Sequence, residues 1–408
     1  MKSKRGLSLI IVSALVLALA AMGLAGCGGG GGNDNTTTST TAAATEPPTE
    51  PPTEPPTEAP TEAPTEAPTE APDVETTTAA AAAGFDANAV IGVALPWLGT
   101  QNWAEANDMF QTDLSSAGFN PIVQHANNQV PDQQRQIESM IQSGAKALVV
   151  APVDGSQLGA ILEQAKAAGI YVIGYDRLIE NTAAVDGVVQ FGSIKTGEMQ
   201  GQALLQGLAE QKGAPPYNIE IFAGGPADPN ALSFYTGAMN VLQPKIDDGT
   251  LIVVSGQTDF TQCATLDWDN GKAQTRMDSL LSGFYSDKEI QGALAPNDGI
   301  ARAIITASEQ AGQPLPVTSG LDAENESVAW VWEGRQYCTI SKPTDELVGR
   351  TIEIIKGLQA GNGLPAPDST TDNGTIEVGL YELAPLIVTK ANARDAFAND
   401  PDRLALLN

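Results

Sequence analysis

Histidine is almost absent from this sequence, and basic residues are scarce. A Ser/His catalytic triad or a multi-histidine metal site would depend on the one histidine, His125, so neither is expected. The chain has 21 Lys and Arg against 49 Asp and Glu, which gives a formal net charge of -28. Nucleic acids and anionic membrane surfaces bind clustered Lys and Arg, so this balance argues against both as partners.

Cysteine is also rare, and the first of the three cysteines ends a targeting signal. Lys2, Lys4 and Arg5 precede an apolar run over residues 7–24, and Leu24-Ala25-Gly26-Cys27 follows. This order is typical of a secretion signal over residues 1–26. The last four residues resemble a bacterial lipobox, so Cys27 is expected to be lipidated and to anchor the chain outside the cytoplasm, on the cell membrane at the bacterial surface. An uncleaved signal would also leave the rest of the chain outside.

The other two cysteines are Cys263 and Cys338. Disulfides are permitted outside the cytoplasm, so we expect these two residues to be bonded to each other. A bond also requires that the two lie close together in the fold, which the sequence does not show.

Residues 27–87 lack a core-forming pattern and are predicted to be a disordered linker. Residues 45–72 consist of seven copies of a four-residue repeat, Thr-Glu-Pro-Pro and then Thr-Glu-Ala-Pro. Regular proline favours the extended polyproline II conformation, in which these residues would span roughly 85 Å. The repeat predicts a spacer that holds a folded domain away from a membrane.

From residue 88 onward, short apolar runs alternate with helix-like segments in two successive rounds. Such alternation indicates parallel sheets with helices on both faces, and two rounds indicate two sheets. The fold class predicted is therefore α/β, with two doubly wound parallel-sheet lobes.

Asp176 and Arg177 follow the apolar run over residues 170–175 and stand just past its carboxyl end. Ligands of open α/β sheets bind in the crevice beyond that end. A carboxylate beside a guanidinium offers both acceptors and donors to a polyol hydroxyl. The alternative is a surface ion pair with no ligand.

Polar residues and tryptophans recur after most of the predicted strands. They predict a polar crevice between two sheets, walled by aromatic rings. A pyranose suits such a crevice, because its C–H faces stack on indole rings and its hydroxyls pair with Asp, Asn, Arg and Lys. A tryptophan at a helix start is equally compatible with a place in the core. The residues in question include Asn102, Trp103, Asp176, Arg177, Asn230, Trp268, Asn297, Asp322 and Lys342.

Several stretches spread from residue 90 to the end resemble the type I periplasmic sugar-binding proteins, and most closely their xylose-binding and multiple-sugar-binding branch. They include Gly174-Tyr175-Asp176-Arg177-Leu178, Ala295-Pro296-Asn297-Asp298-Gly299 and Thr339-Ile340-Ser341-Lys342. The resemblance implies two lobes joined by crossover hinge strands, with the sugar enclosed when the lobes close. The lobes expected are residues 88–192 plus 343–375 and residues 193–342 plus 376–408.

The resemblance also assigns roles to the residues of the predicted crevice. Trp103 and Trp268 fall where the family sandwiches the sugar ring, and Asp176 and Arg177 fall on its hydroxyl-binding pair. Asn230, Asn297, Asp322 and Lys342 match its remaining ligands. No catalytic residue, cofactor or metal is implied.

The chain departs from the family pattern at Leu98, Asn102 and Leu321, where relatives carry a lysine, an arginine and a glutamine. These departures predict a less cationic pocket that takes a different or smaller sugar. The stretch over residues 267–271 superficially resembles a calcium loop but lacks the closing glutamate.

The leading hypothesis is a lipid-anchored monosaccharide-binding protein, monomeric, that delivers a neutral pentose or hexose to an ABC permease and its ATPase. The alternative is a sugar sensor that presents its ligand to a chemoreceptor or sensor kinase. An enzyme such as a glycosidase is not expected, because no carboxylate pair stands out as acid and base. A repressor with this fold is disfavoured by the secretion signal and by the missing basic helical domain.

Overall fold

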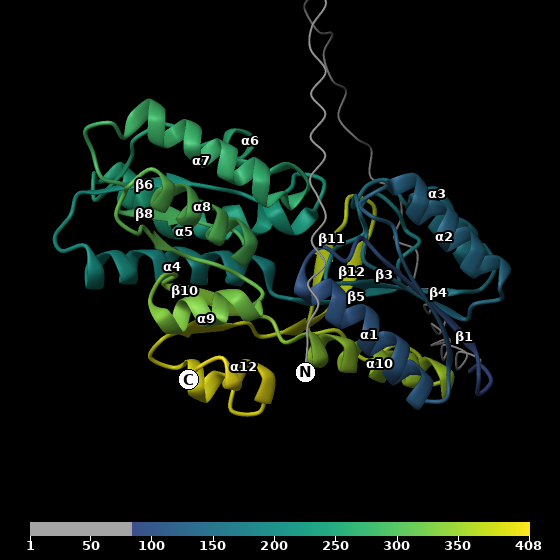
Figure 1. The fold of residues 1–408 in the computed structure, drawn as a ribbon. Coiled ribbons are helices and arrows are strands. Elements are labelled where there is room, and N and C mark those ends of the chain that lie inside the picture. The colour runs from purple at the N-terminus through teal and green to yellow at the C-terminus, as the bar shows by residue number, and fades with distance from the viewer. Residues whose placement is uncertain (1–83) are drawn as a thin grey trace, which may run out of the picture. The chain divides into compact units, whose positions relative to one another are not determined.

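The computed structural model describes residues 84–408, which form two α/β lobes (Figure 1). The predicted signal over residues 1–26, the lipidation site Cys27 and most of the predicted linker lie outside the described residues. Within residues 84–408 no helix combines the length and the apolar character needed to cross a membrane.

The first lobe is built on a seven-stranded sheet in the order β11-β12-β5-β4-β3-β1-β2. All neighbouring strands are parallel except β11 and β12, which are antiparallel. Helices cover both faces, and the central strands β1, β3 and β4 are therefore apolar, as in the fully buried β3. The strands are β1 Val90–Leu95, β2 Asn120–His125, β3 Ala147–Val150, β4 Tyr171–Tyr175, β5 Gly187–Phe191, β11 Ser369–Asp372 and β12 Glu377–Leu383.

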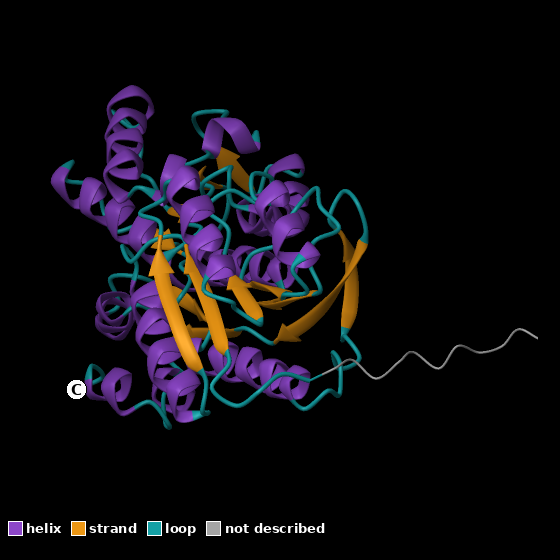
Figure 2. Cartoon of the chain, turned by 90° about the vertical axis from the view of Figure 1, so that its right-hand side faces the viewer, coloured by secondary structure: helices purple, strands orange, loops and turns teal. Residues whose placement is uncertain are grey.

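Two helices pack on each face of this sheet, and Figure 2 shows the strands enclosed between helices. Helices α1 and α10 bury one face with an aromatic core around Phe110 and Tyr175, whose ring centroids are 5.0 Å apart. Helices α2 and α3 bury the other face. Their bounds are α1 Gln101–Ser116, α2 Val130–Gln142, α3 Gly159–Ala167 and α10 Thr344–Gln359.

The second lobe repeats this plan with a four-stranded parallel sheet in the order β7-β6-β8-β9. Helices α4 and α5 cover one face, and α7 and α8 cover the other. The strands are β6 Tyr217–Ile221, β7 Leu251–Val253, β8 Gly292–Leu294 and β9 Val317–Thr318. The helices are α4 Ser193–Gln211, α5 Pro229–Asp247, α6 Phe260–Cys263, the 3-10 turn η1 Leu266–Trp268, α7 Asn270–Phe284, α8 Asp298–Gln310 and α9 Asn325–Glu333.

The chain crosses between the lobes three times, after β5, after β10 and after β12. Strand β10 Cys338–Ser341 pairs antiparallel with β13 Leu386–Thr389, and the chain ends in α11 Ala393–Ala396 and α12 Pro401–Ala405. The third crossing was predicted before β12, at residue 376, and this is wrong. Strand β12 joins the sheet of the first lobe beside β5, so the chain crosses after β12. Residues 376–383 therefore belong to the first lobe.

The expected disulfide is also wrong, because Cys263 and Cys338 are both free and buried. Cys263 ends α6 and lies in the core of the second lobe, whereas Cys338 begins β10 and faces Thr389 of β13. Burial raises the pKa of the Cys263 thiol to about 11 and that of the Cys338 thiol to about 12. Each thiol behaves as a small apolar side chain of the core.

Candidate functional site

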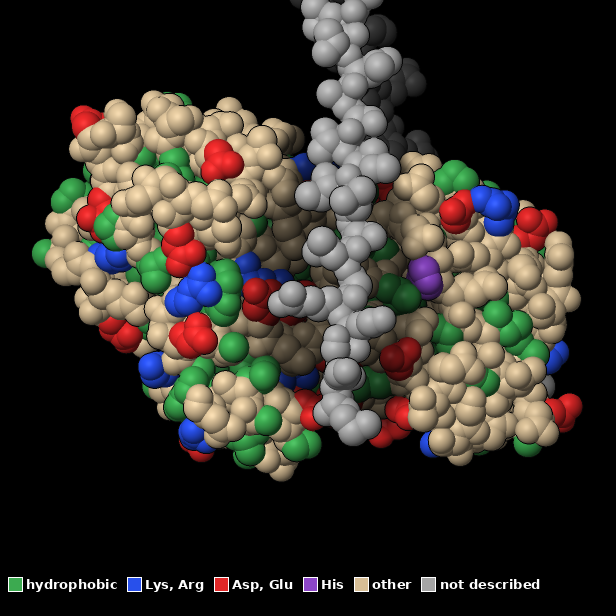
Figure 3. Space-filling view, in the orientation of Figure 1, with side chains coloured by type: hydrophobic (Ala, Val, Ile, Leu, Met, Phe, Trp, Pro, Cys, Tyr) green, Lys and Arg blue, Asp and Glu red, His purple; other side chains and the backbone are tan. Residues whose placement is uncertain are grey.

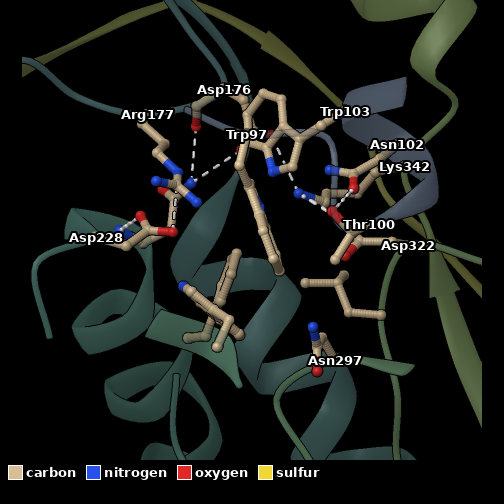
Figure 4. A pocket seen from close by; sticks show the side chains of 14 residues that line it. Trp97, Thr100, Asn102, Trp103, Asp176, Arg177, Asp228, Asn297, Asp322 and Lys342 are labelled. Atoms are coloured by element: carbon tan, nitrogen blue, oxygen red, sulfur yellow. Dashed lines mark hydrogen bonds and ion pairs between the residues drawn. The ribbon is translucent and has the colours of Figure 1, made fainter. Parts of the chain in front are cut away.

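A cavity lies where the carboxyl ends of the strands of both lobes meet, and Figure 4 shows the side chains that line it. All of the predicted site residues line it, namely Asn102, Trp103, Asp176, Arg177, Asn230, Trp268, Asn297, Asp322 and Lys342. Residues from both lobes and from the crossing after β10 therefore converge on one space.

Lys342 is the centre of a buried charge cluster in this cavity. Its Nζ lies 3.1 Å from Asp176 Oδ1 and 3.4 Å from Asp322 Oδ1. Burial alone would lower the pKa of Lys342, but the two carboxylates outweigh burial and raise that pKa above its usual range. The ammonium group is therefore charged and fully committed to the two carboxylates.

Arg177 forms a second ion pair that joins the lobes. Its Nε lies 3.0 Å from Asp228 Oδ2, and its Nη1 donates a hydrogen bond of 3.0 Å to the carbonyl of Pro152. The guanidinium carbon also lies 5.2 Å from the centre of the Trp103 ring. Figure 4 shows this pair on one side of the cavity and Lys342 with Asp322 on the other.

Asn230 adds a direct hydrogen bond between the lobes. Its Nδ2 donates to the backbone carbonyl of Asp176 at 2.8 Å, and its Oδ1 accepts a bond from Ser193 Oγ at 2.8 Å. Asn230 is placed at the start of α5 by Asp228, which caps that helix through the Asn230 amide. The local sequence Asp-Pro-Asn thus fixes both residues at the cavity.

Aromatic rings from both lobes face the cavity. Trp103, on α1, is buried against Tyr175 with ring centroids 6.2 Å apart, and Trp268, in η1, packs against Phe234 with centroids 6.5 Å apart. A Cβ at Gly224 would collide with the Trp268 ring, so only glycine leaves room for that ring beside the loop after β6. The two indoles offer apolar faces to a ligand from opposite lobes.

Three of the predicted site residues have a left-handed backbone. The φ angles are 61° at Asp176, 55° at Trp268 and 88° at Asp322. This conformation is uncommon for residues other than glycine, and above all for a bulky tryptophan. Strained backbone of this kind concentrates at ligand sites, where it aims a side chain at the ligand.

Five further residues line the cavity that were not among the predicted site residues: Trp97, Thr100, Asp228, Phe234 and Leu321. Trp97 follows β1, and Asp228 lies in the loop between β6 and α5, so a position after a strand could have identified both residues. Thr100 precedes α1, and its Oγ1 donates a 2.6 Å hydrogen bond to Asn102 Oδ1. Phe234 lies one turn into α5, where sequence alone cannot distinguish a cavity wall from the core.

The charge balance of the cavity is slightly acidic, with three carboxylates against two cations. Burial raises the pKa of Asp322 to about 6, partly offset by Lys342 and reinforced by Asp176. Burial likewise raises the pKa of Asp228, while Arg177 opposes that rise. Both cations are paired within the protein, so neither is free to bind an anion.

Asp322 is expected to make stability depend on pH. Its native pKa of about 6 exceeds the ordinary value of 3.8, so between these values the native state holds a proton that the unfolded state has released. Stability therefore falls as pH rises through this window, by roughly 3 kcal/mol in total. Asp322→Asn cannot titrate at this position and should lack this loss of stability. The free energy of unfolding of the variant minus that of wild type should therefore increase from pH 4 to pH 6.

Urea unfolding of both proteins at pH 4.5, 5.5, 6.5 and 7.5 measures this difference. Asn adopts the left-handed backbone of position 322 readily, so the comparison isolates the charge. A difference in stability between the two proteins that is constant across this range would contradict the assigned pKa.

Further contacts tie the lobes together beside the cavity. Gln101 Oε1 accepts a 2.7 Å hydrogen bond from the Asn325 amide, and the Gly155 amide donates to the Ala227 carbonyl at 3.2 Å. On α12, Arg403 Nη2 lies 3.1 Å from Glu105 Oε1 of α1, and its Nε donates to the Ala323 carbonyl at 2.8 Å. The two lobes therefore contact each other around the cavity, which describes a closed form.

The cavity can bind polar groups and apolar ring faces. Within residues 84–408 no group of three or more His, Cys, Asp and Glu side chains is arranged to hold a metal ion. On the face shown in Figure 3, Lys and Arg side chains are scattered among Asp and Glu.

Residues 91–363 match the family model of the periplasmic binding protein domain. The chain is 39% identical over 330 residues to the multiple sugar-binding periplasmic receptor of Rhizobium radiobacter, a match that covers 77% of this chain and 93% of the relative. It is 33% identical to the D-xylose-binding periplasmic protein of Escherichia coli, over 76% of this chain and 89% of the relative.

Among solved structures, the chain resembles an ABC transporter solute-binding protein from Clostridium phytofermentans with bound β-D-glucose. The TM-score is 0.74 at 34% identity, and the match covers 77% of this chain and 99% of the other. The predicted resemblance to the xylose-binding and multiple-sugar-binding branch is thereby confirmed. These similar proteins are binding proteins and not enzymes, in agreement with the prediction.

Proposed function

The chain belongs to the type I periplasmic sugar-binding proteins of ABC-type sugar transport, and from this premise we propose that it is a lipid-anchored receptor for a neutral monosaccharide. The receptor closes around the sugar and delivers it to an ABC permease. Cys27, after Leu-Ala-Gly, is the proposed lipid attachment site, and the Thr-Glu-Pro repeat is the proposed spacer above the membrane. A sensory role remains a prediction from the sequence.

The observation that carries the proposal is the cavity lined from both lobes by paired polar groups and indole faces. Trp103 and Trp268 would stack on the two faces of a pyranose, whose C–H groups suit the π surface. Asp176 and Asp322 would accept hydrogen bonds from its hydroxyls. Asn297 Oδ1 already caps α8 through the Ile300 amide, which leaves its Nδ2 as a donor to the sugar.

Charge indicates that the sugar is neutral. Arg177 is paired with Asp228, and Lys342 is paired with Asp176 and Asp322. A sugar acid would bring a fourth carboxylate into a buried site that has no free cation, which is costly. The loss of positive side chains at Leu98 and Asn102 supports the same reading.

Closure couples binding to transport in this proposal. Each lobe contributes part of the site, so a sugar that contacts both lobes favours the closed form over the open one. The Asn230 bond to the Asp176 carbonyl and the Arg177–Asp228 ion pair exist only when the lobes meet. Docking of the closed form on the permease would then pass the sugar on.

Thermal unfolding of the purified full-length protein tests the proposal. A sugar present at 100 times its Kd stabilises the protein by about 2.7 kcal/mol, so D-glucose is expected to raise Tm by roughly 5 °C. D-glucuronate, in which a carboxylate replaces the hydroxymethyl group, should give a clearly smaller shift. If no neutral pentose or hexose at 10 mM raised Tm, the proposed function would be wrong.

A further inference from the structure

The short helix α12, close to the end of the chain, belongs to the second lobe. Its apolar side chains and those that follow it share one cluster with side chains of α9, and this cluster includes Val328, Trp332, Leu404, Leu406 and Leu407. Leu407 is fully buried there. The helix is therefore fixed to the second lobe and moves with it when the lobes change their relative position.

Arg403 reaches from α12 to the first lobe. Within its own lobe, its Nη1 lies 2.8 Å from Asp400 Oδ2, and its Nε donates a 2.8 Å hydrogen bond to the Ala323 carbonyl. Its Nη2 lies 3.1 and 3.3 Å from the two carboxylate oxygens of Glu105, on α1 of the first lobe. Every nitrogen of the guanidinium is thus engaged, and the Nη2 contact is the one that joins the lobes.

A groove runs between α1 and α12 beside this ion pair. It is lined by Glu105 and Met109 on one side and by Pro401 and Arg403 on the other. The two charged side chains therefore bridge a gap between the helices, and the pair forms only while the lobes are close together. It is partly buried, with 17% of the Arg403 side chain and 24% of the Glu105 side chain exposed, so solvent screens it less than a surface pair.

The contacts of Arg403 end next to residues that line the cavity. On the first lobe, Glu105 follows Trp103 by two residues on α1. On the second lobe, the Ala323 carbonyl directly follows Asp322, and both of these residues have a left-handed backbone, with φ angles of 49° and 88°. Arg403 itself does not line the cavity. Any effect of Arg403 on a bound sugar must therefore act through the position of the two walls.

We propose that Arg403 is a positioning residue for sugar binding: its ion pair with Glu105 forms as the lobes close and retains the sugar without touching it. The proposal rests on the proposed function, because the ligand retained is the neutral monosaccharide. Opening must break the ion pair, so the pair slows dissociation of the sugar, whereas association with the open form is unaffected. Because the pair does not contact the ligand, it strengthens the binding of every sugar by the same factor.

Glu105→Gln tests the proposal, because it removes one charge of the pair and leaves the contacts of Arg403 within the second lobe intact. By calorimetry on the full-length protein, D-glucose affinity should fall about fivefold, the upper value for ion pairs that stay partly exposed. Stopped-flow tryptophan fluorescence should place this loss in the dissociation rate, with the association rate changed less than twofold. Any second sugar that wild type binds, such as D-xylose, should lose affinity by the same factor.

Arg403→Gln and the variant with both substitutions complete a double-mutant cycle. If the two residues act as a pair, Glu105→Gln should change D-glucose affinity less than twofold once Arg403 has been replaced. Glu309→Gln is the matched control, because it removes a carboxylate that lies 3.0 Å from Arg335 Nη2 within the second lobe. Its D-glucose affinity should equal that of wild type.

Three results would overturn the role of Arg403 while leaving the proposed function intact. They are wild-type affinity in Glu105→Gln, losses from the two single substitutions that multiply in the double variant, and a loss confined to the association rate. A wild-type protein that binds no monosaccharide would instead refute the proposed function, and the retention of the sugar by this pair with it.

Discussion

Asp176→Asn is expected to weaken D-glucose binding by roughly 100- to 1000-fold. Asp176 accepts from Lys342 Nζ at 3.1 Å, and its backbone carbonyl accepts the bond from Asn230 that joins the lobes. The variant keeps the shape but leaves the buried Lys342 with one carboxylate instead of two, and removal of one partner of a buried ion pair costs about 3–5 kcal/mol. The sugar also loses a charged acceptor.

The fold of Asp176→Asn should survive, because asparagine tolerates the left-handed backbone at this position. Circular dichroism establishes the fold, and isothermal titration calorimetry measures the affinity. Asp154→Asn is the matched control: Asp154 follows the neighbouring strand β3, but its carboxylate accepts from the Ser156 amide and hydroxyl within its own turn. The D-glucose affinity of the control should lie within twofold of wild type. If a well-folded Asp176→Asn variant also kept that affinity, Asp176 would not be a ligand-binding residue.

Trp268→Ala is expected to have the other large effect, a loss of roughly 30- to 1000-fold in D-glucose affinity. Its indole lies on Gly224 and Gly225 and beside Phe234, so the ring is held in place before any ligand binds. Aromatic anchors of this kind contribute about 2–4 kcal/mol when truncated. The variant removes the apolar face from the second lobe, and with it part of the sugar's preference for the closed form.

Trp330→Ala controls for the loss of an indole elsewhere in the same lobe. Trp330 lies on α9, where the Arg335 guanidinium stacks 3.6 Å from the centre of its ring, and it does not line the cavity. Trp330→Ala should leave D-glucose affinity unchanged. Trp268→Phe should retain part of the D-glucose affinity, because a smaller ring keeps a π face.

If Trp268→Ala itself bound D-glucose as tightly as wild type does, stacking of the sugar on Trp268 would be excluded.

The sequence predicts best those features that the fold itself determines. Parallel strands flanked by helices end at one edge of a sheet, so the sequence alone predicts that residues such as Asp176, Asn297 and Asp322 lie together. The structure brings all nine predicted residues to one cavity. A position after a strand does not by itself place a residue in the cavity. Asp298 also follows a strand, but its carboxylate is buried and accepts hydrogen bonds from the Glu324 amide, Gln336 and Thr339.

Contacts between distant segments were not predictable in this way. The Arg177–Asp228 ion pair depends on how the lobes meet, and no local pattern records that arrangement. The same reason explains why β12 was assigned to the wrong lobe: its sequence indicates a strand but not which sheet it joins. For the same reason, the sequence does not show that Cys263 and Cys338 lie in separate parts of the fold.

The chain joins the folded domain at Phe85, on the first lobe. The Phe85 amide donates to the Gln359 carbonyl at the end of α10, and the Phe85 ring lies 6.3 Å from that of Phe119, so the entry point is fastened to the first lobe alone. A pull on the chain from upstream of residue 84 is therefore borne by the first lobe and does not load the three crossings. In the proposed membrane-anchored protein, the second lobe would therefore move relative to the first without strain from the anchor.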